Sequence, residues 1–170
     1  DGMVITISDI EEHLVLAGGT RGDDVLPYFL DRPNILDGRQ GDDTLHGGYD
    51  ADTYLFGVGY DLDTIIEVLN GQSYAGAIDR VVFGALVNPT GVIVRRDGDD
   101  LIMTLADSGD ELRIVQGAEQ RLVEEFHFVD GTVWVYDDLR RELLRGTDGA
   151  DHLIGFDNNN DLLDGGLGSD

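Results

Sequence analysis

A nine-residue glycine-rich repeat is the feature that most restricts how this chain can fold. Its pattern is Gly-Gly-x-Gly-x-Asp-x-U-x, where U is a large apolar residue, and copies begin at Gly19, Gly38 and Gly47. Glycine tolerates the positive φ angles of tight turns, and aspartate bonds to the backbone of the turn that contains it. Each copy therefore predicts a tight turn followed by a very short strand, and the array predicts stacked repeats.

Other copies of the repeat are less regular. One covers residues 29–37 and has Asn34 where the pattern has Asp, and a stretched copy covers residues 56–65, where either Asp61 or Asp63 holds the Asp position. The pattern then stops and resumes at Gly146. A flexible loop rich in Gly and Asp would not keep an apolar residue two places after each Asp, so we expect these residues to point into a core. They are Leu26, Leu36, Leu45, Tyr54, Ile65, Leu153 and Leu163.

A second, longer repeat is superimposed on the first. Residues 1–4 resemble residues 130–133 at an offset of 129, and the first glycine motif follows each copy, at Gly19 and Gly146, at an offset of 127. We interpret the chain as one full unit of a tandem repeat followed by the start of the next unit. On this interpretation it is a fragment of a larger protein.

Charge and composition exclude several classes of partner. The 170 residues include 35 acidic and 11 basic side chains, which gives a formal net charge of -24. Such a surface excludes nucleic acid as a partner and disfavours anionic membranes. The absence of cysteine excludes disulfides and thiolate metal sites, and no apolar run approaches the ~18 residues of a membrane span. The crowded carboxylates repel one another unless cations neutralise them.

The spacing of the repeats favours calcium as that cation. Two units complete one turn of a flattened spiral, so each turn faces the turn two units further along at about one strand spacing, ~4.8 Å. Calcium takes six to eight oxygen ligands at ~2.3–2.6 Å. Facing turns offer main-chain carbonyls and aspartate carboxylates, with no sulfur or imidazole in a ligand position. The sequence therefore predicts calcium ions between stacked turns.

Consecutive in-register copies of this kind resemble the repeats-in-toxin, or haemolysin-type calcium-binding, family of secreted bacterial toxins, proteases and lipases. The resemblance covers residues 14–67 and 145–170. It implies an all-β fold, in which parallel β-rolls of nonapeptide repeats flank a β-rich connector with short helices. It also implies that one turn binds the ion through carbonyls at positions two and four and its Asp, and the facing turn through carbonyls at positions one and three and its Asp.

Four calcium sites follow from carrying this pattern onto the chain. The first site comprises Thr20, Gly22, Asp24, Gly38, Gln40 and Asp43. The second comprises Leu30, Arg32, Asn34, Gly47, Tyr49 and Asp52. The third joins the turn 56–63, with Asp61 or Asp63, to Arg39, Gly41 and Asp43. The fourth comprises Thr147, Gly149, Asp151, Gly165, Leu167 and Asp170, and Asp161 needs a partner beyond the end of the sequence.

The segment between the two glycine-rich regions is similar to the β-rich segment found beside glycine repeats in some members of the same family. The similarity lies in residues 79–84, 99–105 and 128–134. Apolar alternation and turn residues predict strands over 78–83, 92–96, 101–105, 111–115, 125–129 and 132–136, with a hairpin turn at 97–100. A short helix is predicted over 138–144, with Asp137 as its cap.

We therefore divide the chain into four segments. Residues 1–16 are the end of a preceding connector with its helix, 17–67 a calcium β-roll, 68–144 the connector, and 145–170 the start of a second β-roll. The ends of a β-roll expose backbone and apolar residues, so the connector is expected to cap them. Tyr54, Phe56 and Trp134 are the candidates for this packing.

Functionally, we expect a calcium-binding module and no enzyme. The four histidines are scattered without zinc spacing, and no serine has the context of a nucleophile. The resemblance implies a secreted, extracellular bacterial protein, such as a toxin, that leaves the cell unfolded through type I secretion machinery and folds on binding calcium. Its partners are then calcium ions and neighbouring repeat units. Two alternatives are an adhesin or carbohydrate-binding module with structural calcium, and an accessory module of a polysaccharide-modifying enzyme or lipase.

Overall fold

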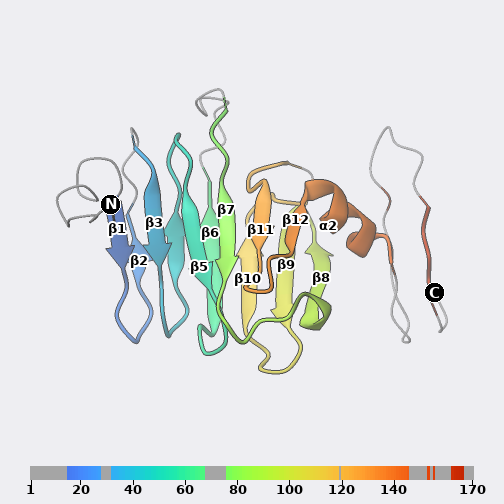
Figure 1. Ribbon diagram of the computed structural model, residues 1–170, viewed down its shortest axis with the longest axis horizontal. Helices are drawn as coiled ribbons and strands as arrows, with labels where there is room; N and C mark the ends of the chain where they lie inside the picture. Colours follow the sequence, from blue (N-terminus) through green and yellow to red (C-terminus); the bar gives the residue numbers. More distant parts are fainter. Residues whose placement is uncertain are drawn as a thin grey trace, which may run out of the picture.

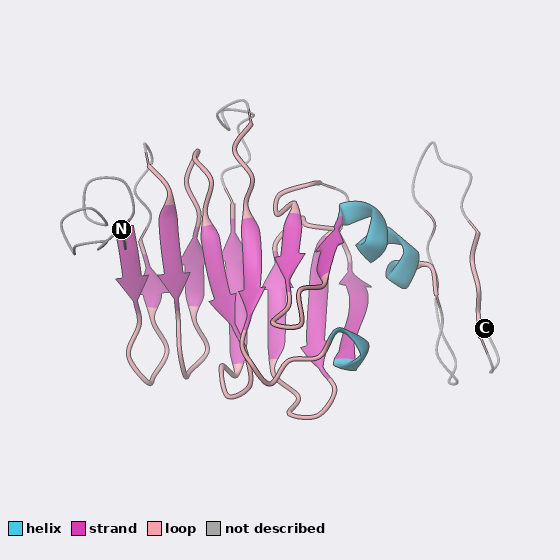
Figure 2. Ribbon diagram, in the orientation of Figure 1, coloured by secondary structure: helices cyan, strands magenta, loops and turns pink. Residues whose placement is uncertain are grey.

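Over the residues that it describes, the computed structural model is β-rich, with two six-stranded sheets and one short α-helix (Figures 1 and 2). It describes residues 15–27, 32–67, 76–118, 120–145, 153, 155 and 162–166. One sheet contains β1 (Val15–Gly18), β3 (Asn34–Asp37), β5 (Thr53–Phe56), β7 (Arg80–Phe83), β11 (Glu125–His127) and β12 (Val133–Val135), in that order. The other contains β2 (Val25–Leu26), β4 (Thr44–His46), β6 (Leu62–Ile66), β10 (Glu111–Ile114), β9 (Asp100–Leu105) and β8 (Val92–Asp97), in that order.

Up to β7, successive strands alternate between the two sheets. Within each sheet these strands are parallel and in register, so that Leu36 pairs with Tyr54, and Leu45 with Ile65. The connector continues both sheets, because β10 pairs in parallel with β6 and β11 with β7. Antiparallel pairing follows in β8–β9–β10 and β11–β12, which makes both sheets mixed. The two sheets thus run without a break across the segment boundary expected after residue 67.

The core lies between the sheets and is built from the apolar position of each repeat. Leu26, Leu36, Leu45, Tyr54 and Ile65 are all buried, as the spacing of two residues after Asp predicts. Each belongs to a strand in which buried and partly exposed residues alternate, because neighbouring side chains of a strand point to opposite faces. The prediction does not hold at the far end of the chain, where Leu163 is 47% exposed.

Every strand predicted in the connector is present; four are shorter than predicted, and β8 and β9 are each one residue longer. The hairpin turn at 97–100 is confirmed, because Asp97 pairs with Asp100 and Gly98 has a φ of +63°. A row of aromatic contacts then crosses the first sheet from Phe56 to Phe83, Phe128 and Trp134. Phe56 and Trp134 therefore join the repeats to the connector as predicted, and Tyr54 does so as the register partner of Val81 in β7.

The helix α2 (Tyr136–Leu143) packs against β8 and β12, the last strand of each sheet (Figure 1). It starts earlier than predicted, and Asp137 is not its cap. The side chain of Asp138 instead accepts a hydrogen bond from the backbone N–H of Val135, at 3.0 Å. Its buried residues, Tyr136, Leu139 and Leu143, cover edges that would otherwise expose unpaired backbone. None of the helices in the described residues is long and apolar enough to span a membrane.

Candidate functional site

The turns that follow β1, β3 and β5 lie side by side along one edge of the molecule, which is the lower edge in Figure 1. We call this row of turns, residues 19–24, 38–43 and 57–63, the lower edge. The backbone N–H of Asp24 donates to Asp43 Oδ1 at 2.7 Å, and the N–H of Asp43 donates to Asp63 Oδ1 at 3.1 Å. The three repeat aspartates thus form a file, in which the carboxylates of Asp43 and Asp63 each accept from the aspartate one turn earlier.

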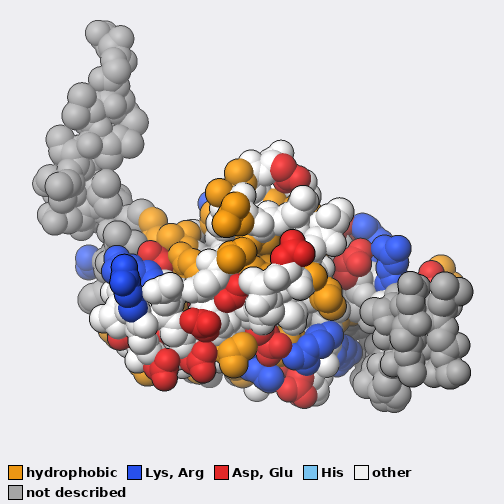
Figure 3. Space-filling model, turned by 90° about the horizontal axis from the view of Figure 1, so that it is seen from below, with side chains coloured by type: hydrophobic (Ala, Val, Ile, Leu, Met, Phe, Trp, Pro, Cys, Tyr) orange, Lys and Arg blue, Asp and Glu red, His pale blue; other side chains and the backbone are white. Residues whose placement is uncertain are grey.

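Asp63, rather than Asp61, occupies the Asp position of the stretched repeat. Thr44 and Thr64 are register partners in β4 and β6, so the residues before them, Asp43 and Asp63, are equivalent. Asp61 is exposed, and its Oδ2 accepts from the N–H of Gly41 at 3.2 Å. Asp61 therefore lies outside the file of repeat aspartates. Figure 3 looks onto the lower edge and shows acidic side chains distributed along it.

Burial of Asp43 and Asp63 is the most unusual feature of the lower edge. Each residue is only 1% exposed. Oδ2 of each carboxylate is buried and has no hydrogen-bond partner in the part of the chain that the structure describes. Asp24 differs, because its Oδ2 accepts from the backbone N–H and the hydroxyl of Thr20, at 2.6 and 2.8 Å. A buried carboxylate without a compensating partner is strongly destabilising, so two adjacent ones call for a cation.

The pKa shifts of the aspartates in the file agree with the need for a cation. Burial raises the pKa of Asp63 from 3.8 to about 8, and repulsion from Asp43, Asp42 and Asp61 adds to the rise. Burial also raises the pKa of Asp43. The hydrogen bonds from Thr20 instead lower the pKa of Asp24. A divalent cation beside Asp43 and Asp63 would favour their ionised forms, because an opposite charge at short range stabilises a carboxylate.

Two glycines allow the turns of the lower edge to stack this closely. Gly38 lies directly against the carboxylate of Asp43, where a Cβ atom would collide with Oδ2. Gly41 has a φ of +114°, and a Cβ atom there would lie 2.6 Å from the carbonyl carbon of Gly22 in the neighbouring turn. Gly41 is thus required by contact between turns as well as by its positive φ, and Gly38 by contact with the aspartate of its own turn.

We expect Gly41→Ala to lower the free energy of unfolding in the presence of calcium by about 2 kcal/mol or more, because it adds a strained φ to a collision with the backbone. Urea denaturation followed by circular dichroism measures this. Gly22→Ala is the matched control, since a Cβ atom at Gly22 meets no atom within 4 Å. Equal stability of the two variants would show that the turns do not stack as described.

The opposite edge, which we call the upper edge, carries a second file. It contains Asn34, the turn 47–52, and Asp79 ahead of β7. The N–H of Asn34 donates to Asp52 Oδ1 at 2.7 Å, the N–H of Asp52 to Asp79 Oδ1 at 2.7 Å, and the N–H of Asp79 to Glu124 Oε2 at 2.8 Å. This repeats the arrangement of the lower edge.

Asp79 and Glu124 were not among the predicted site residues because they lie outside the glycine-rich repeats. Each nevertheless stands two residues ahead of a buried apolar side chain, Val81 and Phe126. This is the same acid-x-apolar spacing that marks the repeats. The same spacing also precedes other buried residues, such as Leu112 and Leu139, so it fits both residues without singling them out.

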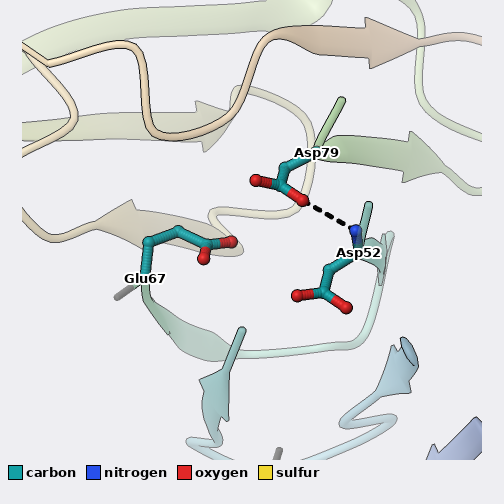
Figure 4. Close-up of side chains that lie close together, drawn as sticks. All are labelled: Asp52, Glu67 and Asp79. Carbon is teal, nitrogen blue, oxygen red and sulfur yellow. Dashed lines mark hydrogen bonds between the residues drawn. The ribbon is translucent and has the colours of Figure 1, made fainter. Parts of the chain in front are cut away.

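Three carboxylates converge on the upper edge (Figure 4). Oxygens of Asp52, Glu67 and Asp79 all lie within 4.8 Å of one another, and Asp52 and Glu67 are buried. Glu67 Oε1 accepts the hydroxyl of Tyr54, and Asp52 Oδ2 accepts the N–H of Gly48 at 2.6 Å. Burial raises the pKa of Asp79 to about 7, with repulsion from Asp52 and Glu124 adding to it. Burial also raises the pKa of Asp52.

The structure brings together the predicted residues of the first and third sites. Their turns stack through the hydrogen bonds of Asp24, Asp43, Asp63 and Gly41, and Thr20 contacts Asp24 directly. Arg39 is exposed with a φ of 76°, and Gln40 is exposed. Gly22 lies in the turn that Gly41 contacts.

The second and fourth predicted sites are described less completely. In the second, Leu30 lies outside the described residues, while Asn34 Nδ2 donates both to the carbonyl of Arg32 and to Asp52. Gly47 packs against the Tyr54–Glu67 pair, and Tyr49 is half-buried in the same turn. In the fourth, Gly165 is described, and the remaining residues lie outside the described residues. They are Thr147, Gly149, Asp151, Asp161, Leu167 and Asp170.

Comparison with known protein families gives one match within the connector. Residues 100–138, which run from β9 into α2, match the family model of the haemolysin-type calcium binding protein related domain. The glycine-rich turns lie outside the matched residues. The match supports a relation between this segment and haemolysin-type calcium-binding proteins, and it suggests calcium as the ion for the acidic turns beside it.

Proposed function

We propose that this chain is a calcium-binding β-roll module of a larger secreted bacterial repeat protein, and that it binds calcium along the lower edge without catalysing a reaction. The observation that carries the proposal is the pair of buried Oδ2 atoms of Asp43 and Asp63, which have no hydrogen-bond partner among the described residues. Both belong to the repeat position for which the sequence predicts calcium ligands.

The donor set of the lower edge favours calcium over other metals. The side chains facing the file are carboxylates and the Thr20 hydroxyl, and the turns add main-chain carbonyls. Calcium accepts six to eight such oxygens with flexible geometry, whereas magnesium demands a near-ideal octahedron and keeps several waters. Asp24, Asp43 and Asp63 would hold the ions and supply the negative charge that neutralises them. The family match of the connector supports the same ion.

The strand order supports a β-roll and a tandem repeat. Alternation of β1 to β7 between two parallel sheets is the arrangement expected of a flattened spiral with two repeats per turn. Arg145 and Asp164 form a parallel bridge, and each lies 127 residues after the paired residues Gly18 and Asp37. This is the offset of the long sequence repeat. We infer that a second unit begins with that bridge.

Calcium binding would then drive folding outside the cell. A chain of net charge -24 with files of buried carboxylates is poorly stable without cations, and an ion that binds only the folded form stabilises it by mass action. Extracellular calcium modules commonly bind with dissociation constants of ~10⁻⁴–10⁻³ M. The module would stay unfolded at the low calcium level inside the cell, which suits export through type I secretion machinery, and would fold after it.

A calcium titration followed by far-ultraviolet circular dichroism tests this proposal. We expect the β signal to develop cooperatively as calcium is added to the full chain in chelator-treated buffer, with a midpoint of ~10⁻⁴–10⁻³ M. The same titration with magnesium, at equal ionic strength, is the control for simple charge screening and should leave most of the signal undeveloped. A calcium-independent spectrum, together with no bound calcium on equilibrium dialysis, would overturn the proposal.

A further inference from the structure

Asn34 occupies the repeat position that is Asp in the other turns. It precedes the buried Leu36 by two residues, as Asp43 precedes Leu45 and Asp52 precedes Tyr54. Asn34 is fully buried at the start of β3, in a file with Asp52 and Asp79. A neutral amide thus stands on the upper edge where the lower edge has a carboxylate.

The amide group of Asn34 contacts the oxygens expected to bind a cation. Its Nδ2 donates to the carbonyl of Arg32 at 3.1 Å and to Oδ1 of Asp52 at 2.7 Å. Those two oxygens, together with the side chain at position 34, belong to the ligand set that the repeat pattern predicts for the second calcium site. The NH₂ group therefore supplies two hydrogen-bond donors at the place where an ion would supply positive charge.

The buried carboxylates of the two edges accordingly differ in how many of their oxygens accept hydrogen bonds from the protein. Both oxygens of Asp52 are satisfied by protein donors, since Oδ1 accepts from the N–H and Nδ2 of Asn34 and Oδ2 accepts from the N–H of Gly48. On the lower edge, by contrast, Oδ2 of Asp43 and of Asp63 has no hydrogen-bond partner among the described residues. The residues of the second predicted site therefore do not fit an ion, whereas those of the lower edge do.

We propose that Asn34 acts as a built-in substitute for a calcium ion, so that the Asn34–Asp52 turn is closed by an amide and binds no ion. The identity of residue 34 then determines whether this turn is a calcium site. Replacement of the NH₂ group by a carboxylate oxygen would remove the side-chain donor that lies between the carboxylate of Asp52 and the Arg32 carbonyl and would place a second carboxylate beside them. This inference rests on the proposed function, because it concerns which turns of a calcium-binding module take ions.

Asn34→Asp tests the inference with an almost isosteric change. We expect the variant to bind one calcium ion more per chain than the unmodified protein, measured by equilibrium dialysis with metal analysis at saturating calcium. At a calcium concentration just sufficient to fold the unmodified protein, the thermal midpoint of the variant should lie below that of the unmodified protein, and saturating calcium should reverse the difference. Asn88→Asp is the matched control, because it adds the same charge at an exposed position and should gain no ion.

A second variant keeps the inference testable if Asn34→Asp does not fold. Asp52→Asn should leave the number of bound ions unchanged, because Asp52 binds none in the unmodified protein, whereas Asp43→Asn should lower it. Loss of an ion in Asp52→Asn, or an unchanged ion count in folded Asn34→Asp, would overturn the inference. If the unmodified protein binds no calcium, the proposed function fails. In that case the ion count of Asn34→Asp decides the role of Asn34: the inference stands if the variant acquires an ion and fails if it does not.

Discussion

Asp43→Ala is expected to raise the calcium concentration at the midpoint of folding by roughly 100-fold or more. Asp43 lies in the middle of the lower-edge file, where its Oδ1 accepts from the N–H of Asp24 and its own N–H donates to Asp63. It therefore belongs to both calcium sites proposed on this edge. Loss of a group that merely orients a metal ligand already costs 10–100-fold in affinity, so loss of a shared ligand should cost at least as much. Circular dichroism during a calcium titration measures the shift.

Asp107→Ala is the matched control for this experiment. Asp107 is an exposed residue in the turn between β9 and β10, so its removal changes the net charge equally and leaves the file intact. A surface charge of this kind should move the midpoint by less than about twofold, because exposed charges interact weakly through water. If both variants shift the midpoint equally, calcium acts by general screening and not through Asp43.

The calcium-free chain is expected to lose stability as the pH rises from about 4 to about 8. The pKa of Asp63 is about 8 in the folded state and close to 3.8 when exposed to water. Between these values the folded state holds a proton that the unfolded state has released, so raising the pH favours unfolding. The difference corresponds to a loss on the order of 5 kcal/mol for this group alone. Asp79, with a pKa of about 7, acts in the same direction.

Asp63→Asn should remove most of this pH dependence and stabilise the calcium-free chain at pH 8. The amide keeps the oxygen that accepts from the N–H of Asp43 and replaces the buried charge by a neutral donor, as Asn34 does on the upper edge. Circular dichroism in calcium-depleted buffer at pH 5 and pH 8 compares the variant with the unmodified protein. Asp107→Asn is the control. A pH dependence of undiminished size in Asp63→Asn would assign it to other groups.

Much of this architecture could be predicted from local sequence pattern. The glycines predict tight turns, and the apolar residue two places after each Asp predicts the inward side of each strand; Leu36, Leu45 and Ile65 are indeed buried. The strands of the connector followed from their alternation in the same way. These features depend on residues a few positions apart, because the local backbone conformation alone decides which side of a strand each side chain faces.

The helix boundary and the exposed Leu163 show where local pattern is insufficient. A side chain three residues into α2, Asp138, caps the backbone of Val135, so the helix begins before the residue that propensity favours. Leu163 obeys the repeat spacing and is nevertheless 47% exposed. Its burial depends on a facing sheet, which the spacing of residues within one repeat does not specify.

By itself, the sequence determined which residues form turns, which side chains face the core and which aspartates lie along the edges of the molecule. Tertiary structure alone decided that Oδ2 of Asp43 and of Asp63 is buried without a donor among the described residues, that Asn34 closes its turn with an amide, and that Glu67 and Asp79 meet beside Asp52. The reason is that these contacts join residues 12 to 27 positions apart. Their distances are set by the register of parallel strands across a sheet, whereas turns and strands follow from the conformational preferences of adjacent residues.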